Sequence, residues 1–556
     1  MHRGLARSPQ VVVLIGCVLA IGACATDGEA DGGEEEALTG QEGQDGEEGD
    51  DNSEGSEALT LARGISIDEV EINQGTRIPI GFGGDWVDGS ERLGYLIASR
   101  DSLLRVHYSV DESWEPRNIE ARLTLGFPDG TTKTFTQEKL VEASSQPYSL
   151  DGTFWFGIVA EEGNTVAGTT YQVELWETEA GAGAALEEGL HTNPAEGPEL
   201  IGFETVPMQI KVVLVPIEYN GKLPNLTAEI EQQVVNNLYE QNPTTEILHE
   251  IHSPLPYESN LTNLGSLLPV MSQLRSAEGA DPNVYYHALV DVGSVSLGGV
   301  LGISQLASAN QSDSSSRVSA TVLWSANPGV GADTFTHETG HAQGLFHVEC
   351  PNGGAAGPDP AYPHENGRIG NWGFGIRRFL MYDPDDAYDY MSYCGPSWVS
   401  DWTWNKTYQR IKTLTSWDFE SNAGSEEPMG TLLIGAIYPD GSREWWTVPG
   451  RINPEEISGQ DRFEFEVDGQ LVEGWGELDV LSDGETQWVK VELPAAPEQL
   501  GAITHIRGDE AHSVDPAKIG SHHAVVSDWR PSFRSTRRAA GTSHSMHSSR
   551  SVAACA

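Results

Sequence analysis

The stretch that organises this chain is HETGHAQGLFH, residues 337–347, which follows the pattern H-E-x-x-H-x-x-G-x-x-H. On a helix, His337 and His341 lie at i and i+4, so both imidazoles project from one face. Gly344 can adopt positive φ, which ends the helix and turns the chain so that His347 returns to the same point. Three neutral imidazoles leave the fourth position of a tetrahedral metal open, as a catalytic zinc site requires. The alternative is an amphipathic helix whose three histidines make ordinary hydrogen bonds.

Glu338 follows the first of these histidines directly. Its carboxylate can therefore reach a water that the metal activates, and take a proton from it. We predict one Zn²⁺ per chain, held by His337, His341 and His347, with Glu338 as the general base of a hydrolytic reaction.

This motif resembles the extended zinc signature of the metzincin metallopeptidases, and a second segment extends the resemblance. DYMSYC, residues 389–394, lies downstream of the three histidines. The resemblance implies that Met391 forms the tight turn beneath the metal site, with its thioether packed there as a non-ligand. It also implies that Tyr393 binds the metal or stabilises the oxyanion. The alternative for Met391 is an ordinary core residue.

Residues 1–23 are typical of an export signal, with Arg3 and Arg7 before the short apolar run 11–21. The following Cys24 resembles the lipidated cysteine of a bacterial lipoprotein, and a simple secretory signal is the alternative. Because Ala25 rather than Asp follows, we expect a lipid-anchored protein of the bacterial outer membrane or cell surface. The lipid would be its only attachment to a membrane.

Export favours disulfide formation. Cys350 follows His347 by three residues, and Cys394 follows Met391 by three. We predict a disulfide between them that ties the zinc-binding loop to the Met391 turn, with two separate thiols as the alternative. The sequence assigns no role to Cys555. The paired cysteines and the Met-Ser-Tyr-Cys ending make the resemblance closest to pappalysin-like and mucin-degrading bacterial metzincins.

With 556 residues the chain is too long for a single core, and its net charge of −51 argues against nucleic acid as a partner. Periodicity and composition predict a multidomain protein, in which the resemblance implies an α/β metzincin-like catalytic domain between two all-β, sandwich-like domains. The expected segments are a disordered acidic tether (24–62), a β-sandwich-like domain with a linker (63–205), the zinc peptidase domain (208–418), a second β-domain (424–511) and a disordered tail (512–556).

Within the catalytic domain, the apolar segment 209–217 is expected to be a central strand and 316–324 a strand near the sheet edge. An exposed edge strand can pair with an extended substrate, so 316–324 is the candidate for that role. The zinc-binding helix is expected to start after Asp333 or Thr334, which can cap it. A closing helix is expected over 405–414.

The function that these features predict is a zinc-dependent endopeptidase acting, as a monomer, on extracellular proteins or glycoproteins. The competing prediction is a cell-surface binding or adhesin lipoprotein with a non-catalytic metzincin-like domain. A zinc hydrolase acting on non-peptide bonds is a third. The sequence does not reveal the substrate or the cleavage specificity.

Overall fold

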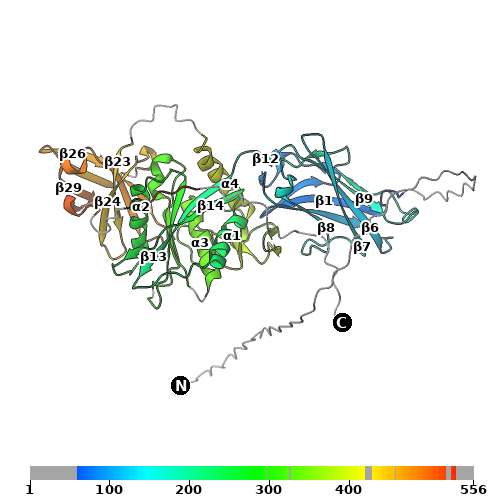
Figure 1. The fold of residues 1–556 in the computed structure, drawn as a ribbon, viewed down its shortest axis with the longest axis horizontal. Coiled ribbons are helices and arrows are strands. Elements are labelled where there is room, and N and C mark those ends of the chain that lie inside the picture. The colour runs from blue at the N-terminus through cyan, green and yellow to red at the C-terminus, as the bar shows by residue number, and fades with distance from the viewer. Residues whose placement is uncertain are drawn as a thin grey trace, which may run out of the picture. The chain divides into compact units, whose positions relative to one another are not determined.

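A computed structural model describes residues 59–533, except 296, 325–326, 420–428, 458 and 521–526. The predictions for the export signal, Cys24, most of the acidic tether and Cys555 lie outside the described residues. The described chain is largely β-sheet, arranged in several sheets with few helices (Figure 1). Among its helices, none is both long and apolar enough to cross a membrane.

Two antiparallel sheets near the N-terminus pack around one core, as the alternating apolar pattern predicts. Inward-facing residues of both sheets, such as Val106 and Leu123, are fully buried in it. The first sheet has the order β3-β2-β1-β5-β8 and the second β10-β9-β6-β7, with β11 beside β9. The strands are β1 (Ile65–Asn73), β2 (Arg77–Phe82), β3 (Asp85–Trp86), β5 (Ser102–Val110), β8 (Phe154–Ile158), β6 (Arg117–Gly126), β7 (Thr132–Val141), β9 (Thr170–Glu177), β10 (Thr192–Asn193) and β11 (Glu199–Leu200), and a small parallel pair joins β4 (Leu96–Ile97) to β12 (Phe203–Glu204).

The central sheet has the order β14-β13-β16-β18-β17, with β15 also paired to β13. Its strands are parallel except β17, which is antiparallel to β18. The strands are β13 (Gln209–Tyr219), β14 (Glu246–Ile251), β15 (Leu255–Tyr257), β16 (Val284–Val290), β17 (Gly302–Ser304) and β18 (Val318–Val322). The helices are α1 (Ala228–Gln241), α2 (Leu267–Ala277), α3 (Pro328–Ala342) and α4 (Asp401–Ser416).

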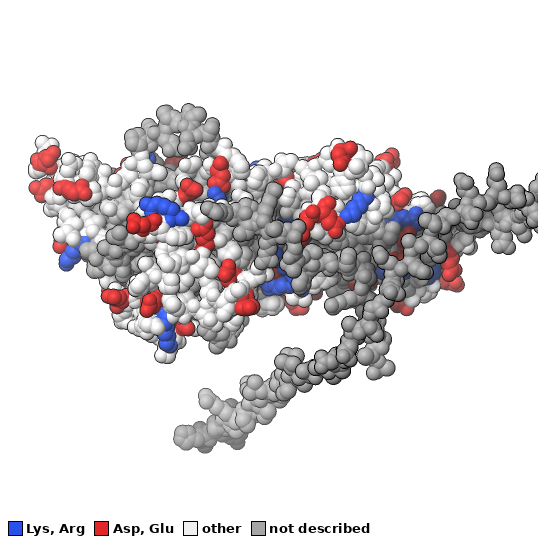
Figure 2. Space-filling view, in the orientation of Figure 1, with Lys and Arg blue, Asp and Glu red and all other residues white. Residues whose placement is uncertain are grey.

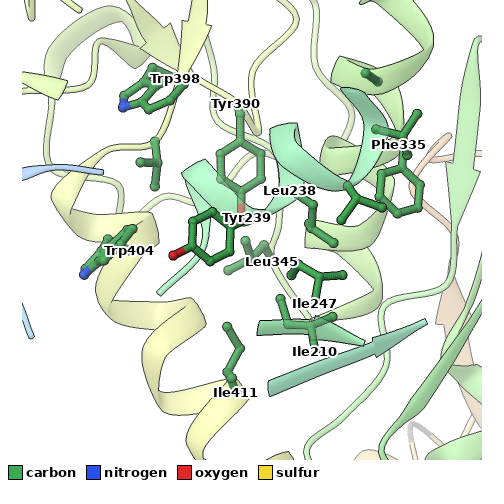
Figure 3. Packing of buried hydrophobic residues seen from close by; sticks show 14 of the residues in the cluster. Ile210, Leu238, Tyr239, Ile247, Phe335, Leu345, Tyr390, Trp398, Trp404 and Ile411 are labelled. Atoms are coloured by element: carbon green, nitrogen blue, oxygen red, sulfur yellow. The ribbon is translucent and has the colours of Figure 1, made fainter. Parts of the chain in front are cut away.

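The continuous apolar run of β13 is explained by burial on both faces of this sheet. Alternate residues such as Val212 and Leu214 belong to a core shared with α1, α3 and α4. Figure 3 labels Ile210 of β13 in this core, together with residues of the three helices. The residues between them, such as Val213 and Val215, face a second core that contains α2. Helix α3, which carries the histidine motif, is thus held between α1 and the sheet.

Two sequence-based expectations for this region are wrong. The segment 316–324 lies next to the sheet edge, as expected, but it is not the edge strand that could pair with a substrate, because β18 lies between β16 and β17. The edge strand is β17, which has only three residues. Helix α3 begins at Pro328 and not after Asp333 or Thr334, because proline is well suited to the first helical turn, where its missing N–H costs no hydrogen bond. Helix α4 includes the predicted 405–414 and extends it at both ends.

Near the C-terminus, two further antiparallel sheets pack around a common core. Their orders are β24-β23-β28-β27 and β26-β25-β29-β30. The strands are β23 (Thr431–Ile437), β24 (Arg443–Pro449), β27 (Glu477–Val480), β28 (Gln487–Glu492), β25 (Asp461–Val467), β26 (Gln470–Trp475), β29 (Leu500–Arg507) and β30 (Glu510–Val514). The first of these sheets also packs on α2, since Trp446 and Trp488 belong to the α2 core and the indole N–H of Trp446 donates to Ser272.

The expected start of a disordered tail at 512 is too early. Strand β30 continues to Val514, and residues 527–533 pack against the central domain. There Ser527 donates a hydrogen bond to Glu278, and the Trp529 ring meets His252 edge-on at 4.9 Å.

The charge excess of the whole chain is visible on the described surface. On the face drawn in Figure 2, acidic side chains are spread over most of the surface, with single basic side chains among them. We find no continuous basic surface among the described residues on this face.

Candidate active site

Helix α3 and the turn that follows it bring the three histidines of the motif together. His337 and His341 lie on the last two turns of α3, and Gly344 follows with φ of 85°. The Gly344 N–H donates to the His341 carbonyl at 2.7 Å, which closes the helix. A side chain at Gly344 would be strained by this φ and would lie 3.0 Å from the Ala307 carbonyl oxygen, so glycine is required here.

The Nε2 atoms of the three histidines point to one position. The Nε2 of His341 lies 3.0 Å from that of His337 and 3.0 Å from that of His347. Each Nδ1 lies 2.7 Å from a backbone carbonyl, which can only accept a hydrogen bond; the carbonyls belong to Tyr390, Leu345 and Ala356. Every Nδ1 therefore carries the proton, and every Nε2 presents a lone pair.

Three converging lone pairs without a proton between them repel each other unless a cation lies among them. Carbonyl acceptors on the outer ring nitrogen are the usual way in which proteins orient metal-binding histidines. The donor set of three imidazoles fits Zn²⁺ and leaves a position for a further ligand. The residues present therefore fit the predicted metal.

Burial keeps these imidazoles neutral, which is the form that binds metals. His337, His341 and His347 are less than a tenth exposed. Burial, and then the neighbouring His347, lower the pKa of His337 to about 4, and burial also lowers the pKa values of His341 and His347.

Met391 lies directly beneath the motif. A methyl group built on Gly340, between the two helical histidines, would lie 2.5 Å from the Met391 sulfur. The turn around Met391 is fixed by Asp389, which is fully buried. Its carboxylate accepts hydrogen bonds from the Met391 N–H at 2.8 Å and from the hydroxyls of Ser400 and Thr403.

The predicted disulfide between Cys350 and Cys394 is present. It joins the loop after His347 to the residue after Tyr393. The Tyr393 ring meets the His347 ring edge-on at 4.7 Å and is half exposed. Burial of part of this side chain and the nearby Glu338 raise the pKa of Tyr393 to about 12, so its phenol is neutral at physiological pH.

Glu338 lies in a narrow space between α3 and the sheet edge. A Cβ atom at Gly302 of β17 would lie 2.4 Å from Glu338 Oε1, so a larger residue there would force the Glu338 side chain to move. On the other side, the Ser482 hydroxyl donates to Glu338 Oε2 at 3.3 Å. Burial raises the pKa of Glu338 well above its usual range, and the bond from Ser482 partly offsets this effect.

The structure thus brings together His337, His341, His347, Glu338, Met391, Tyr393 and the disulfide. Sequence reasoning missed Asp389, Gly302 and Ser482 as parts of this region. Asp389 had a local signal, because it is the first residue of the segment DYMSYC, although no role was predicted for it. Ser482 had none, since it lies 144 residues from Glu338 in another sheet.

No protein-family model matches the chain, and no curated protein matches it. Solved structures that match in part include a Bacteroides uniformis beta-glucuronidase, with 10% identity over 42% of this chain and 25% of that chain, at a TM-score of 0.14. A calcium-binding mutant of Bacteroides uniformis beta-glucuronidase 2 has 11% identity over 42% and 26%, at 0.12. A putative beta-galactosidase from Bacteroides fragilis has 10% identity over 41% and 39%, at 0.12. The match thus spans well under half of each of these chains, and TM-scores this low identify no shared fold.

Proposed function

We propose that this chain is a zinc-dependent peptidase of the metzincin class, with residues 208–418 as its α/β catalytic domain. The single observation that carries the proposal is the convergence of the Nε2 atoms of His337, His341 and His347, with Glu338 directly after His337 on α3. His337, His341 and His347 would hold Zn²⁺, one ion per chain. Bound there, zinc would lower the pKa of water toward neutrality and polarise the scissile carbonyl.

Glu338 has the position of a general base in this proposal. It follows a ligand directly, is 4% exposed and therefore acts in a site that excludes bulk water. Its carboxylate accepts the proton of the attacking water and delivers it to the leaving amine. The hydroxyl of Ser482 holds one carboxylate oxygen, which limits the rotation of the side chain.

Tyr393 supplies a neutral hydrogen-bond donor. Its ring contacts His347, and its pKa of about 12 keeps the O–H intact at physiological pH. The phenol is thus available to donate to the oxygen that becomes negative during attack on the carbonyl.

We also propose that the protein works outside the cytoplasm, as a monomer anchored through Cys24. The Cys350–Cys394 disulfide supports this location, because such bonds persist mainly in oxidising compartments. The substrates would then be extracellular proteins or glycoproteins, and the acidic surface argues against nucleic acid.

The test is cleavage by the zinc-loaded protein and by its Glu338→Ala variant. Each would be incubated with casein and with an O-glycosylated mucin, and new peptide termini would be followed by mass spectrometry. Chelator-sensitive cleavage by the wild type alone is the expected result. Zinc binding without cleavage of either substrate would favour the competing function, a binding or adhesin lipoprotein.

A further inference from the structure

The turn between β27 and β28, residues 481–486, reaches the site from the C-terminal sheets. Besides its bond to Glu338, Ser482 makes two bonds to Ser304 of the edge strand β17. The Ser482 N–H donates to the Ser304 carbonyl at 3.0 Å, and the Ser304 N–H donates to the Ser482 hydroxyl at 2.9 Å. Ser482 therefore forms hydrogen bonds with both the N–H and the carbonyl of Ser304, the backbone groups that face away from β18.

Strand β17 has few other groups to offer a ligand. Leu301 and Gln305 bond to β18, as shown by the bonds from Val322 N–H to Leu301 and from Gln305 N–H to Val318. In an antiparallel ladder the paired and outward directions alternate, so Gly302 and Ser304 face outward. Since Ser304 is taken, Gly302 is the outward-facing residue left on β17, and it lies against Glu338.

The turn is fixed in this place by contacts on both of its strands. The Lys490 ammonium on β28 pairs with Asp313 of the central domain at 2.9 Å and with Asp479 of β27 at 2.5 Å. The Gln305 amide, next to Ser304, also donates to Asp479. Leu481, at the start of the turn, is buried in the core shared with α2. These contacts hold the turn against the central domain, beside Glu338.

We propose that this turn closes one end of the substrate path along β17, so that the site cleaves peptide bonds near a chain end. The inference rests on the proposed peptidase function. A substrate strand paired with Gly302 meets Ser482 after about two residues, or roughly 7 Å at the rise of a β-strand. We expect the substrate to pair antiparallel with β17, because antiparallel ladders are the more stable. The side of the path that ends at Ser482 then holds the residues on the amino-terminal side of the cleaved bond.

The test compares the full-length protein with a variant whose turn is shortened. Replacing residues 482–485 by Asn-Gly joins Leu481 to Thr486 through a two-residue hairpin turn, and retains their existing backbone bond. Both proteins would digest a library of long linear peptides, with the cut positions mapped by mass spectrometry. Glu485→Gln, an exposed change in the same turn, is the matched control.

We expect the wild type and the control to cut within about three residues of the amino-terminal end of each peptide. The shortened variant should cut at interior positions as well. Interior cuts by the wild type, at the same frequency as terminal cuts, would overturn the proposal even if the shortened variant failed to fold.

A binding measurement separates this inference from the peptidase proposal. In a Glu338→Gln background, we would measure the affinity for long linear peptides and for the same peptides cyclised through their backbones. The closed path predicts that linear forms bind at least about tenfold more tightly, and that shortening the turn removes the difference. Equal affinities for the linear and the cyclised peptides in the protein with the intact turn would overturn the inference. If no peptide is cleaved but the difference is found, the peptidase proposal fails, whereas the closure of the path along β17 by this turn stands.

Discussion

The sulfur atom of Met391 lies against the backbone of Gly340, between the two histidines of α3. A methyl group on Gly340 would lie 2.5 Å from this sulfur and 3.0 Å from the Tyr390 ring. The contact links helix α3 to the turn whose Tyr390 carbonyl accepts the hydrogen bond from His337 Nδ1–H. Helix and turn are therefore one unit, and the position of the histidines depends on both.

Gly340→Ala tests this contact. We expect a loss of about 1–3 kcal/mol in the free energy of unfolding, because the added methyl overpacks a fully buried contact. Zinc affinity should fall as the helix shifts away from the turn. Chemical denaturation and zinc titration measure the two effects. The double variant with Met391→Ala should recover part of the stability; equal stability of Gly340→Ala and wild type would show that the contact is loose.

Asp389→Ala tests how the turn is held. The substitution leaves the Met391 N–H and the hydroxyls of Ser400 and Thr403 without their acceptor in a buried position. We expect a loss of about 3 kcal/mol in stability, together with weaker zinc binding. Asp385→Ala, at an exposed position of the preceding loop, is the control and should leave both unchanged. Unaltered zinc affinity in Asp389→Ala would contradict a role for this turn in placing the histidines.

Much of this region could be predicted from the sequence, because the spacing of the histidines on a helix is a local property. The turn of the chain at Gly344 could also be predicted, because the turn requires a positive φ and glycine adopts one readily. The edge strand could not be found, since Gly302–Ser304 is too short to show a periodic pattern. The contact of Ser482 with Glu338 depends on how a distant sheet packs on α2, and no local pattern contains that information.

Lys490→Met tests how the C-terminal sheets are attached. The Lys490 side chain is 2% exposed and is surrounded by the carboxylates of Asp313, Glu477 and Asp479. Its loss would leave three largely buried acids unpaired, which typically costs about 3–5 kcal/mol. Thermal unfolding should show this loss, while the exposed Lys222→Met should have little effect. Wild-type stability of Lys490→Met would mean that the cluster does not hold the sheets.

Glu71 in the N-terminal sandwich predicts an acid-sensitive contribution to stability. Burial raises the pKa of Glu71, but its contacts with His107, Arg105 and Arg77 outweigh burial and lower the pKa to about 2. The folded state thus binds fewer protons than the unfolded state, whose pKa is near 4.5. The stabilisation is complete above the unfolded value and is lost as pH falls from there through the folded value.

Urea unfolding across this acidic range measures the effect. Glu71→Gln should lower stability at neutral pH and reduce its fall with acid, whereas the exposed Glu142→Gln should do neither. An unchanged pH dependence in Glu71→Gln would contradict the charge pairing described for this core.

The zinc content of the purified protein, measured by native mass spectrometry, tests the proposed metal site most directly. We expect one zinc per chain in the wild type and in Glu338→Gln, and none in His341→Ala. His249→Ala, a histidine that pairs with Glu231 away from the site, should retain the metal. A wild-type protein that binds no zinc, or a His341→Ala variant that binds it fully, would contradict the assignment of His337, His341 and His347 as a metal site.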